Sequence, residues 1–281
     1  MPILTLEKIG PTVMRERAER ARELFRSSIW PIYGSRKGNS TNVARGDLAL
    51  VGSCVFISIR NRYYIITAAH VTDNLSHTPL WIPRGEDFWP IHGMLHETVS
   101  PEGQRKLDVF DCCWVEISEQ ARSGFKRATF LTQDRFSHNR ASSQNRFFMA
   151  YGYPRSKNKK FFKEEIQPRA LSLTGCSSEP HETPQELIET RKKHIFLRYS
   201  PESVENEQQE PHNPTAPAGM SGGALIDLGD FSRPENSAGS GGSPPLLAGI
   251  LLEYQRTYQA MVAVNIRMIT DAIENRERTE Y

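Results

Sequence analysis

A serine framed by glycines is the residue of this chain whose setting points most directly to chemistry. It occurs in the run Pro217-Ala218-Gly219-Met220-Ser221-Gly222-Gly223, just before a strand-like run that begins at Ala224. Gly219 permits a tight bend in which its N–H and that of Ser221 can form a pocket for the oxyanion that arises when a hydroxyl attacks a carbonyl. The segment predicts a nucleophile at Ser221 and an oxyanion hole made by Gly219 and Ser221. Because Gly-Ser turns are common, the prediction depends on partners elsewhere in the chain.

The base that such a serine needs is present upstream, directly after a predicted β-hairpin. Residues 55–59 and 63–67 are rich in β-branched and aromatic side chains, and they flank a short turn, which is typical of a hairpin. His70 follows after two alanines that are small enough to pack against a core. Taken alone, a histidine after a strand is more often a surface or core residue. Together with the glycine-framed serine, His70 is predicted to be the general base.

Two aspartates compete for the role of the acid that orients the histidine. Such an acid is buried and accepts a hydrogen bond from the imidazole, which fixes the tautomer of the ring. Asp111 stands at the head of the apolar run 112–117, which is predicted to be a core strand. Asp108 lies earlier, behind Leu107, and is expected to be a solvated residue in a loop or at a strand start. We favour Asp111, and Asp108 remains the alternative.

In these three blocks the chain resembles the trypsin/chymotrypsin-like serine peptidases. The blocks are Thr67-Ala68-Ala69-His70, Asp111 with its apolar strand, and Gly219-Met220-Ser221-Gly222-Gly223, and their order of histidine, aspartate and serine is that of the family. The resemblance covers roughly residues 45–270. It implies a serine endopeptidase that works through an acyl-enzyme, without a cofactor or metal, on a protein or peptide substrate.

The resemblance also implies a fold and its division along the chain. The expected fold is dominated by β-structure, with two six-stranded Greek-key β-barrels, an N-terminal helix and a C-terminal helix. Residues 1–46 would be the N-terminal helix and a lead-in loop. Residues 47–145 would form the first barrel, carrying His70 and Asp111, and residues 146–281 the second barrel, carrying Ser221, with the C-terminal helix.

One departure from the family pattern bears on regulation. Digestive and clotting members have an aspartate before the serine, which pairs with a new N-terminus after zymogen cleavage. This chain has Met220 there, and a methionine cannot form that ion pair. The Gly-Met-Ser-Gly-Gly form is similar to intracellular bacterial members, which are often activated by partners. By analogy we expect a bacterial protein, an activating protein partner and a role in regulated, defensive proteolysis.

The residues of the specificity pocket follow from the same resemblance. They would be Thr215 and Ala216, before the serine, and Leu252, Glu253 and Tyr254, on the strand at 247–253 and just after it. Because Thr215 is not an aspartate, a preference for Arg or Lys in the manner of trypsin is not indicated. A small or neutral pocket is expected, although the nearby Glu253 leaves a basic preference open.

Composition indicates where such a protein would work. The formal net charge is +2, which gives no argument for binding nucleic acid, and no apolar run is long enough to span a membrane. The N-terminus lacks the pattern of a secretory signal. Four cysteines without the spacing of a disulfide framework or a zinc site favour free, mostly buried thiols and a cytoplasmic location. His92 and His96 are four apart, but their neighbours favour a loop over a metal-binding helix.

The remaining segments give the expected order of elements. A charged helix with an apolar stripe is predicted over 11–28, packed on a barrel or, alternatively, docking a partner. The barrel strands are expected to begin near Leu48, and the Gly-Ser tract 236–245 is expected to be a mobile loop. Further strands are predicted at 147–154, 166–173, 194–199, 247–253 and 262–266, and a helix at 267–276.

Two other functions fit the same residues. The chain could be an interaction or sensor module with a protease fold whose activity is latent until a partner binds, and the N-terminal helix and long polar inserts would then be assembly surfaces. An intact triad argues against a purely structural role. An esterase with the same triad is the third hypothesis, and it would need a small acyl pocket.

Overall fold

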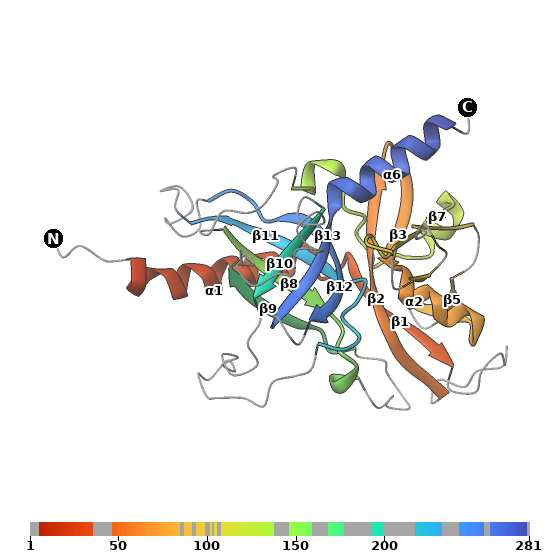
Figure 1. Ribbon diagram of the computed structural model, residues 1–281, viewed down its shortest axis with the longest axis horizontal. Helices are drawn as coiled ribbons and strands as arrows, with labels where there is room; N and C mark the ends of the chain where they lie inside the picture. The colour runs from red at the N-terminus through yellow and green to blue at the C-terminus, as the bar shows by residue number, and fades with distance from the viewer. Residues whose placement is uncertain are drawn as a thin grey trace.

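The computed structural model describes residues 6–35, 47–84, 87–91, 94–98, 102, 104–105, 108–137, 146–158, 168–176, 193–198, 217–231, 242–255 and 259–279. Over these residues the chain forms two curled antiparallel β-sheets, one of seven strands and one of six, with a long helix near each end (Figure 1). The predicted chymotrypsin-like double β-barrel is confirmed. Most of the predicted Gly-Ser loop lies outside the described residues.

The first sheet contains four strands whose positions were not predicted from the sequence. Its strand order is β5-β4-β1-β2-β3-β7-β6. The strands are β1 (Ile29–Ser35), β2 (Leu48–Ile59), β3 (Arg62–Ala68), β4 (Leu80–Arg84), β5 (Asp87–Pro90), β6 (Leu95–Glu97) and β7 (Cys112–Ile117). The unpredicted strands are β1, β4, β5 and β6. Strand β1 lies in the segment predicted to lead into the barrel, and it pairs antiparallel with both β2 and β4. Over the described residues this sheet therefore has seven strands where six were expected.

The second sheet follows the predicted strands closely. Its order is β10-β13-β12-β11-β8-β9. The strands are β8 (Arg146–Gly152), β9 (Leu171–Cys176), β10 (His194–Arg198), β11 (Ala224–Asp230), β12 (Leu246–Gln255) and β13 (Ala260–Asn265). The strand predicted over 166–173 begins and ends later, as β9, and the others lie within a few residues of their predicted bounds. The short helix α3 (Glu119–Ser123) and the 3₁₀ turn η4 (Gln133–Arg135) lie in the connection between the sheets.

The hairpin that precedes the histidine turns in two residues. Ile59 of β2 pairs with Arg62 of β3, so Arg60 and Asn61 alone make the turn. Both have positive φ, 48° and 64°, which is the geometry of a type I′ turn and matches the twist of the two strands. Because this turn fixes the register of β3, it also fixes where the strand ends and His70 begins.

The N-terminal helix α1 (Leu6–Phe25) packs on the second sheet. Its buried side chains, Val13, Ala18, Ala21 and Phe25, recur at helical spacing. Between them the buried Arg17 donates to the main-chain oxygen of Leu228 on β11, and its guanidinium lies 5.3 Å from the centre of the Phe231 ring. Figure 1 shows α1 lying along this sheet. The prediction of a helix packed on a barrel is confirmed. The apolar stripe of α1, which could otherwise have bound a partner, is buried against the second sheet.

The C-terminal helix α6 (Ile266–Thr279) connects the second sheet to the first. Ile266, Ile269 and Ile273 bury its apolar face. Its Glu274 pairs at 2.8 Å with Arg60 in the hairpin turn of the first sheet. None of the helices in the described part of the chain combines the length and apolar character required to cross a membrane.

Candidate active site

His70 is held at the end of β3 by contacts with a single aspartate. It lies in the short helix α2 (Ala69–Thr72), directly after the strand. Its main-chain N–H donates to Asp111 Oδ1 at 2.9 Å, and its ring Nδ1 lies 2.5 Å from Asp111 Oδ2. The N–H of Ala69 donates to the main-chain oxygen of Asp111 at 2.8 Å. With Nδ1–H directed at the carboxylate, the other ring nitrogen, Nε2, is left as the proton acceptor.

Asp111 occupies the position before β7 that the sequence analysis favoured. Its φ is 42°, an uncommon value for a residue with a side chain, so the surrounding structure must hold it there. Asp108 is not the solvated residue that was expected, and that prediction was wrong. The side chain of Asp108 is only 2% exposed, and it accepts hydrogen bonds from Thr98 Oγ1 at 2.7 Å and from Arg105 at 3.1 Å. Asp108 thus shapes the loop, while Asp111 contacts the histidine.

The environment of His70 favours its protonated form. Burial lowers the pKa of His70, but the hydrogen bond and the charge of Asp111 raise it, and so do the charges of Asp73 and Glu253. The raising contributions prevail, so the pKa of His70 lies above its ordinary value of 6.5. A base with a raised pKa accepts a proton more readily, which is what the deprotonation of a serine requires.

The Ser221 loop is built from two consecutive turns. The N–H of Met220 donates to the oxygen of Pro217 at 2.9 Å, and that of Gly223 donates to the oxygen of Met220 at 2.9 Å. Gly219, with φ of 96°, is the third residue of the first turn, a position that favours glycine in a type II turn. Among the described residues, no acceptor is bonded to the N–H of Gly219 or to that of Ser221. The two donors predicted for the oxyanion hole are therefore free to bind a ligand.

A main-chain contact fixes the direction of one of these donors. The 3₁₀ turn η5 (Arg155–Lys157) begins after β8, and the N–H of Arg155 donates to the oxygen of Ala218 at 2.7 Å. In a trans peptide the C=O and the following N–H point in opposite directions. With the oxygen of Ala218 held by Arg155, the N–H of Gly219 is turned away from η5. The side chain of Arg155 anchors this turn to the first sheet, because Nε donates to the oxygen of Leu50 at 3.2 Å.

The first sheet also holds the serine loop through Ser53 of β2, which sequence reasoning missed. The N–H of Ser53 donates to the oxygen of Ser221 at 2.8 Å, and its hydroxyl donates to the oxygen of Gly219 at 3.2 Å. The oxygen of Ser53 accepts from Thr67 Oγ1 at 2.8 Å. A Cβ at Gly222 would overlap that oxygen and Thr67 Oγ1, so glycine is required there. The signal available in the sequence was the pair Gly52-Ser53, which interrupts the apolar run 48–57.

Met220 anchors the loop from the other side. Its side chain is fully buried in the core of the second sheet, among Phe148, Leu225 and their neighbours. At the position where the digestive and clotting peptidases have an ion-paired aspartate, this chain therefore has an apolar side chain that anchors the loop in the core. The N–H of Gly222 completes the attachment by donating to the oxygen of Leu251 on β12 at 2.7 Å.

The two halves of the site meet at Gly52 of β2. A Cβ at Gly52 would lie 2.7 Å from the Val71 methyl groups and 3.2 Å from the oxygen of Ser221. The residue after His70 and the main chain of Ser221 are therefore both packed against one glycine. Within the described part of the chain, however, Ser221 Oγ forms no hydrogen bond with His70. Contacts of this kind are often longer in the free state and shorten when substrate binds.

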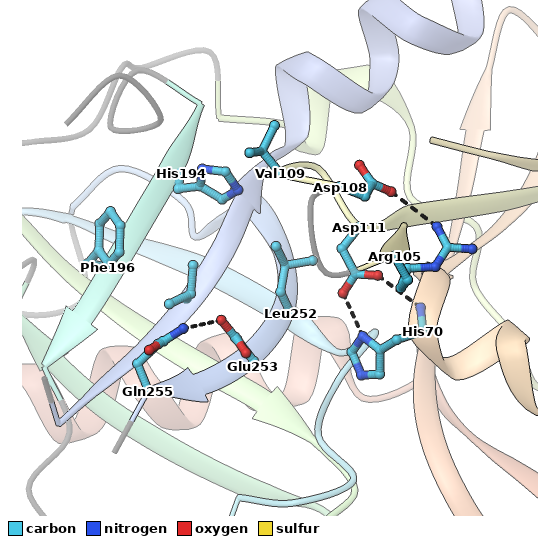
Figure 2. A pocket seen from close by; sticks show the side chains of 11 residues that line it. His70, Arg105, Asp108, Val109, Asp111, His194, Phe196, Leu252, Glu253 and Gln255 are labelled. Carbon is cyan, nitrogen blue, oxygen red and sulfur yellow. Dashed lines mark hydrogen bonds and ion pairs between the residues drawn. The ribbon is translucent and has the colours of Figure 1, made fainter. Parts of the chain in front are cut away.

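A cavity of about 420 Å³ opens beside the His70–Asp111 pair (Figure 2). Of the five predicted pocket residues, Leu252 and Glu253 line it. Tyr254 instead packs against the core of the second sheet, and Thr215 and Ala216 lie outside the described residues. The pairing of β12 with β13 shifts register between Leu251 and Glu253, which leaves Leu252 at a bulge.

Cysteine and histidine residues in the described structure show no metal centre. None of the described His, Cys, Asp and Glu side chains form a group that could hold a metal ion. His92 lies outside the described residues. The prediction of a loop at His96 was wrong, because His96 is on β6, where pairing with β7 makes the segment a strand, and its ring packs against Trp114 with ring centres 5.8 Å apart. All four cysteines are free and three are buried, as expected. Burial raises the pKa of Cys113 to about 12, so this thiol stays protonated and unreactive.

Comparisons with known proteins find only distant likenesses. No family model and no curated protein matches the chain. Among solved structures, a serine endoprotease from Yersinia pestis aligns with TM-score 0.49 and 15% identity, over 92% of this chain and 65% of that one. The serine protease domain of the Sesbania mosaic virus polyprotein aligns with TM-score 0.46 and 13% identity, over 87% and 91%. The active form of the Rv3671c protease from M. tuberculosis aligns with TM-score 0.43 and 13% identity, over 91% and 82%.

Identity is low and the TM-score is below 0.5 in all three, so the fold is described from the strands of this chain alone. The chain spans 65% of the length of the Yersinia protein. The class that the two sheets and their topology define is the chymotrypsin-like double β-barrel. Any activity must be argued from the residues of the site itself.

Proposed function

We propose that the chain is a serine endopeptidase with Ser221 as nucleophile, His70 as general base and Asp111 as the acid that orients His70. One observation carries the proposal. At the contact between the two sheets, a glycine-framed serine and the residue after an aspartate-bound histidine both pack against Gly52 of β2, and among the described residues the N–H groups of Gly219 and Ser221 have no acceptor. A base, a nucleophile and paired donors are the parts that acyl transfer requires.

The proposed reaction proceeds through an acyl-enzyme. Ser221 Oγ attacks the peptide carbonyl carbon while its proton passes to His70 Nε2. The carbonyl electron pair moves to the oxygen, which the N–H groups of Gly219 and Ser221 stabilise as an oxyanion. The C–N bond then breaks, and His70 returns the proton to the leaving amine. Water, deprotonated by His70, hydrolyses the ester. Asp111 keeps Nδ1 protonated and stabilises the imidazolium in both halves.

A latent form of the same enzyme is the second candidate. It is favoured by the absence of a hydrogen bond between Ser221 Oγ and His70 in the described structure. In this version an activating protein partner closes the distance between the two halves. Activation by a liberated N-terminus is disfavoured, because Met220 is buried and carries no charge to receive an amino group.

Labelling with a fluorophosphonate probe tests the proposal and separates the two candidates. The probe reacts with an activated serine and requires no knowledge of the substrate. We expect the purified protein to be labelled, Ser221→Ala to lose all labelling, and Ser123→Ala, which changes an exposed serine on α3, to keep it. Labelling that survives in Ser221→Ala would overturn the assignment. Folded protein that is not labelled alone but is labelled in the presence of a partner would favour the latent form.

A further inference from the structure

The cavity beside His70 combines apolar walls with one carboxylate at its edge. Leu252, Phe196 and Val262, from three strands of the second sheet, and Val109, from the loop before Asp111, supply apolar surface. Glu253 is exposed and lies on the same strand as Leu252 (Figure 2). Such a cavity suits a long side chain with an apolar stem and a charged end.

The charged groups around the cavity leave it acidic. Arg105 is the cation in its lining, but its guanidinium is shared by Asp73 at 2.9 Å, Glu97 at 2.6 Å and Asp108 at 3.1 Å. The charge of Asp111 is directed at His70. Glu253 accepts a hydrogen bond from the neutral amide of Gln255, and among the described residues no Lys or Arg is paired with it. His194, the remaining titratable group, is buried on β10.

One edge of β12, which no described strand covers beyond Leu251, indicates how a peptide would reach Glu253. Strand β11 pairs with β12 only over 246–250, and Leu251 is bonded to Gly222 and Gly223 of the serine loop. Beyond Leu251, the described structure has β13 on one side of β12 and no strand on the other. An extended peptide can add to such an edge. Both strands that pair with β12 are antiparallel to it, and its parallel contact, between Leu247 and Phe136, is an isolated bridge, so we expect the peptide to run antiparallel as well.

This direction decides which part of the substrate meets the cavity. From Leu251, beside the serine loop, β12 runs away toward Gln255. An antiparallel peptide, followed from its N-terminal to its C-terminal end, therefore passes residues 255 to 252 of β12 before it reaches Ser221. The residues that lie along Leu252 and Glu253 are those that precede the cleaved bond.

We infer that the cavity selects peptides with a lysine or arginine among the four residues before the cleaved bond, with the cation at Glu253 and the stem over Leu252. The inference rests on the proposed function, and it names the substrate class of that site. It concerns the cavity beside His70, not the pocket predicted at Thr215 and Ala216. Because Glu253 is exposed, we expect a preference of about fivefold, the size of a partly exposed ion pair.

The test is a peptide-cleavage comparison on the full chain. A library of quenched peptides, scanned at the four positions before the bond, identifies the preferred position. At that position, paired peptides with lysine, norleucine or glutamate are compared by kcat/KM. We expect lysine over norleucine by about fivefold in the wild type. The ratio should fall to about one in Glu253→Gln and invert in favour of glutamate in Glu253→Lys. Glu119→Gln, which removes an exposed carboxylate on α3, should keep the wild-type ratio.

Binding measurements keep the two proposals separable. The same peptides, labelled with a fluorophore, are titrated into Ser221→Ala, where affinity can be measured without turnover. Equal affinities and equal cleavage of lysine and norleucine peptides by protein that the fluorophosphonate labels would overturn the specificity inference alone. A lysine preference in binding, with no labelling and no cleavage, would overturn the proposed chemistry and retain the acidic cavity as a peptide-binding site.

Discussion

The two halves of the candidate site are stabilised in different ways. In the first sheet, charged side chains hold the histidine: Asp111 binds both the main chain and the ring of His70. In the second, main-chain groups hold the serine loop, through glycines with positive φ and through the N–H groups of Ser53 and Arg155. The position of His70 therefore depends on the charge of one residue, whereas the shape of the Ser221 loop depends on the geometry of its peptide groups. Substitutions can therefore be chosen to damage one half and leave the other intact.

The largest effect is expected from removing the charge in the first half. In Asp111→Asn the amide can still contact the ring, but it no longer favours Nδ1–H or stabilises the imidazolium. We expect kcat for a peptide substrate to fall about a thousand- to ten-thousandfold, with KM little changed. Steady-state kinetics on folded protein, checked by circular dichroism, measures this.

Asp108→Asn is the matched control for that substitution. It removes the same charge three residues earlier, from a buried carboxylate that binds Thr98 and Arg105 and does not contact His70. We expect a lower melting temperature and a loss of kcat at least tenfold smaller than in Asp111→Asn. If the two variants lost kcat equally, the assignment of Asp111 as the orienting acid would fail.

An intermediate effect is expected from a main-chain change in the second half. Arg155→Pro removes the N–H that holds the oxygen of Ala218 and places the proline Cδ where that proton was, so the peptide must turn and misdirect the N–H of Gly219. The substitution suits the site, because Arg155 begins a 3₁₀ turn and Pro154 has ψ of 138°, which a following proline accepts. We expect kcat to fall about a hundred- to a thousandfold, the loss typical of one oxyanion donor.

Arg155→Ala separates the main chain of this residue from its side chain. Alanine keeps the N–H and loses only the hydrogen bond from Nε to Leu50. We expect kcat within about fivefold of the wild type and a small loss of stability, of roughly 1 kcal/mol. Pre-steady-state measurement of the acylation rate distinguishes the two variants. Equal rates in Arg155→Pro and Arg155→Ala would contradict the role given to the N–H of Arg155.

The sequence predicted the residues that act through their side chains better than those that act through their main chains. The hairpin, the strand that begins at Cys112 and the glycine-framed turn could all be read from residue types, so His70, Asp111 and Ser221 were placed on the correct elements. Ser53 and Arg155 act largely through main-chain groups that every residue except proline possesses, and residue type gives no signal for such a role. Asp108 was predicted to be solvated because its cationic partner, Arg105, is recognisable only once the loop is folded.

Strand β1 shows the same limit at the level of the fold. It contains Pro31 and Gly34, residues that disfavour strands, and local propensity therefore indicates a loop. The segment is a strand because β2 and β4 lie on either side of it and pair with it. Long-range pairing of this kind overrides local preference and cannot be read from a short window of sequence.

The smallest expected effect is on the pH above which His70 is neutral and can act as the base. Because His70 must be neutral to act as base, its raised pKa places the acid limb of kcat/KM above pH 6.5. The charge of Glu253 is one of the causes, so Glu253→Gln should move the limb to lower pH, while Glu119→Gln should leave it in place. The pH profile of cleavage of one norleucine peptide by each variant measures the shift without involving the lysine preference. A limb that stayed fixed in Glu253→Gln would show that the charge at the edge of the cavity does not reach His70, and that the raised pKa is set on the first sheet, by Asp111 and Asp73.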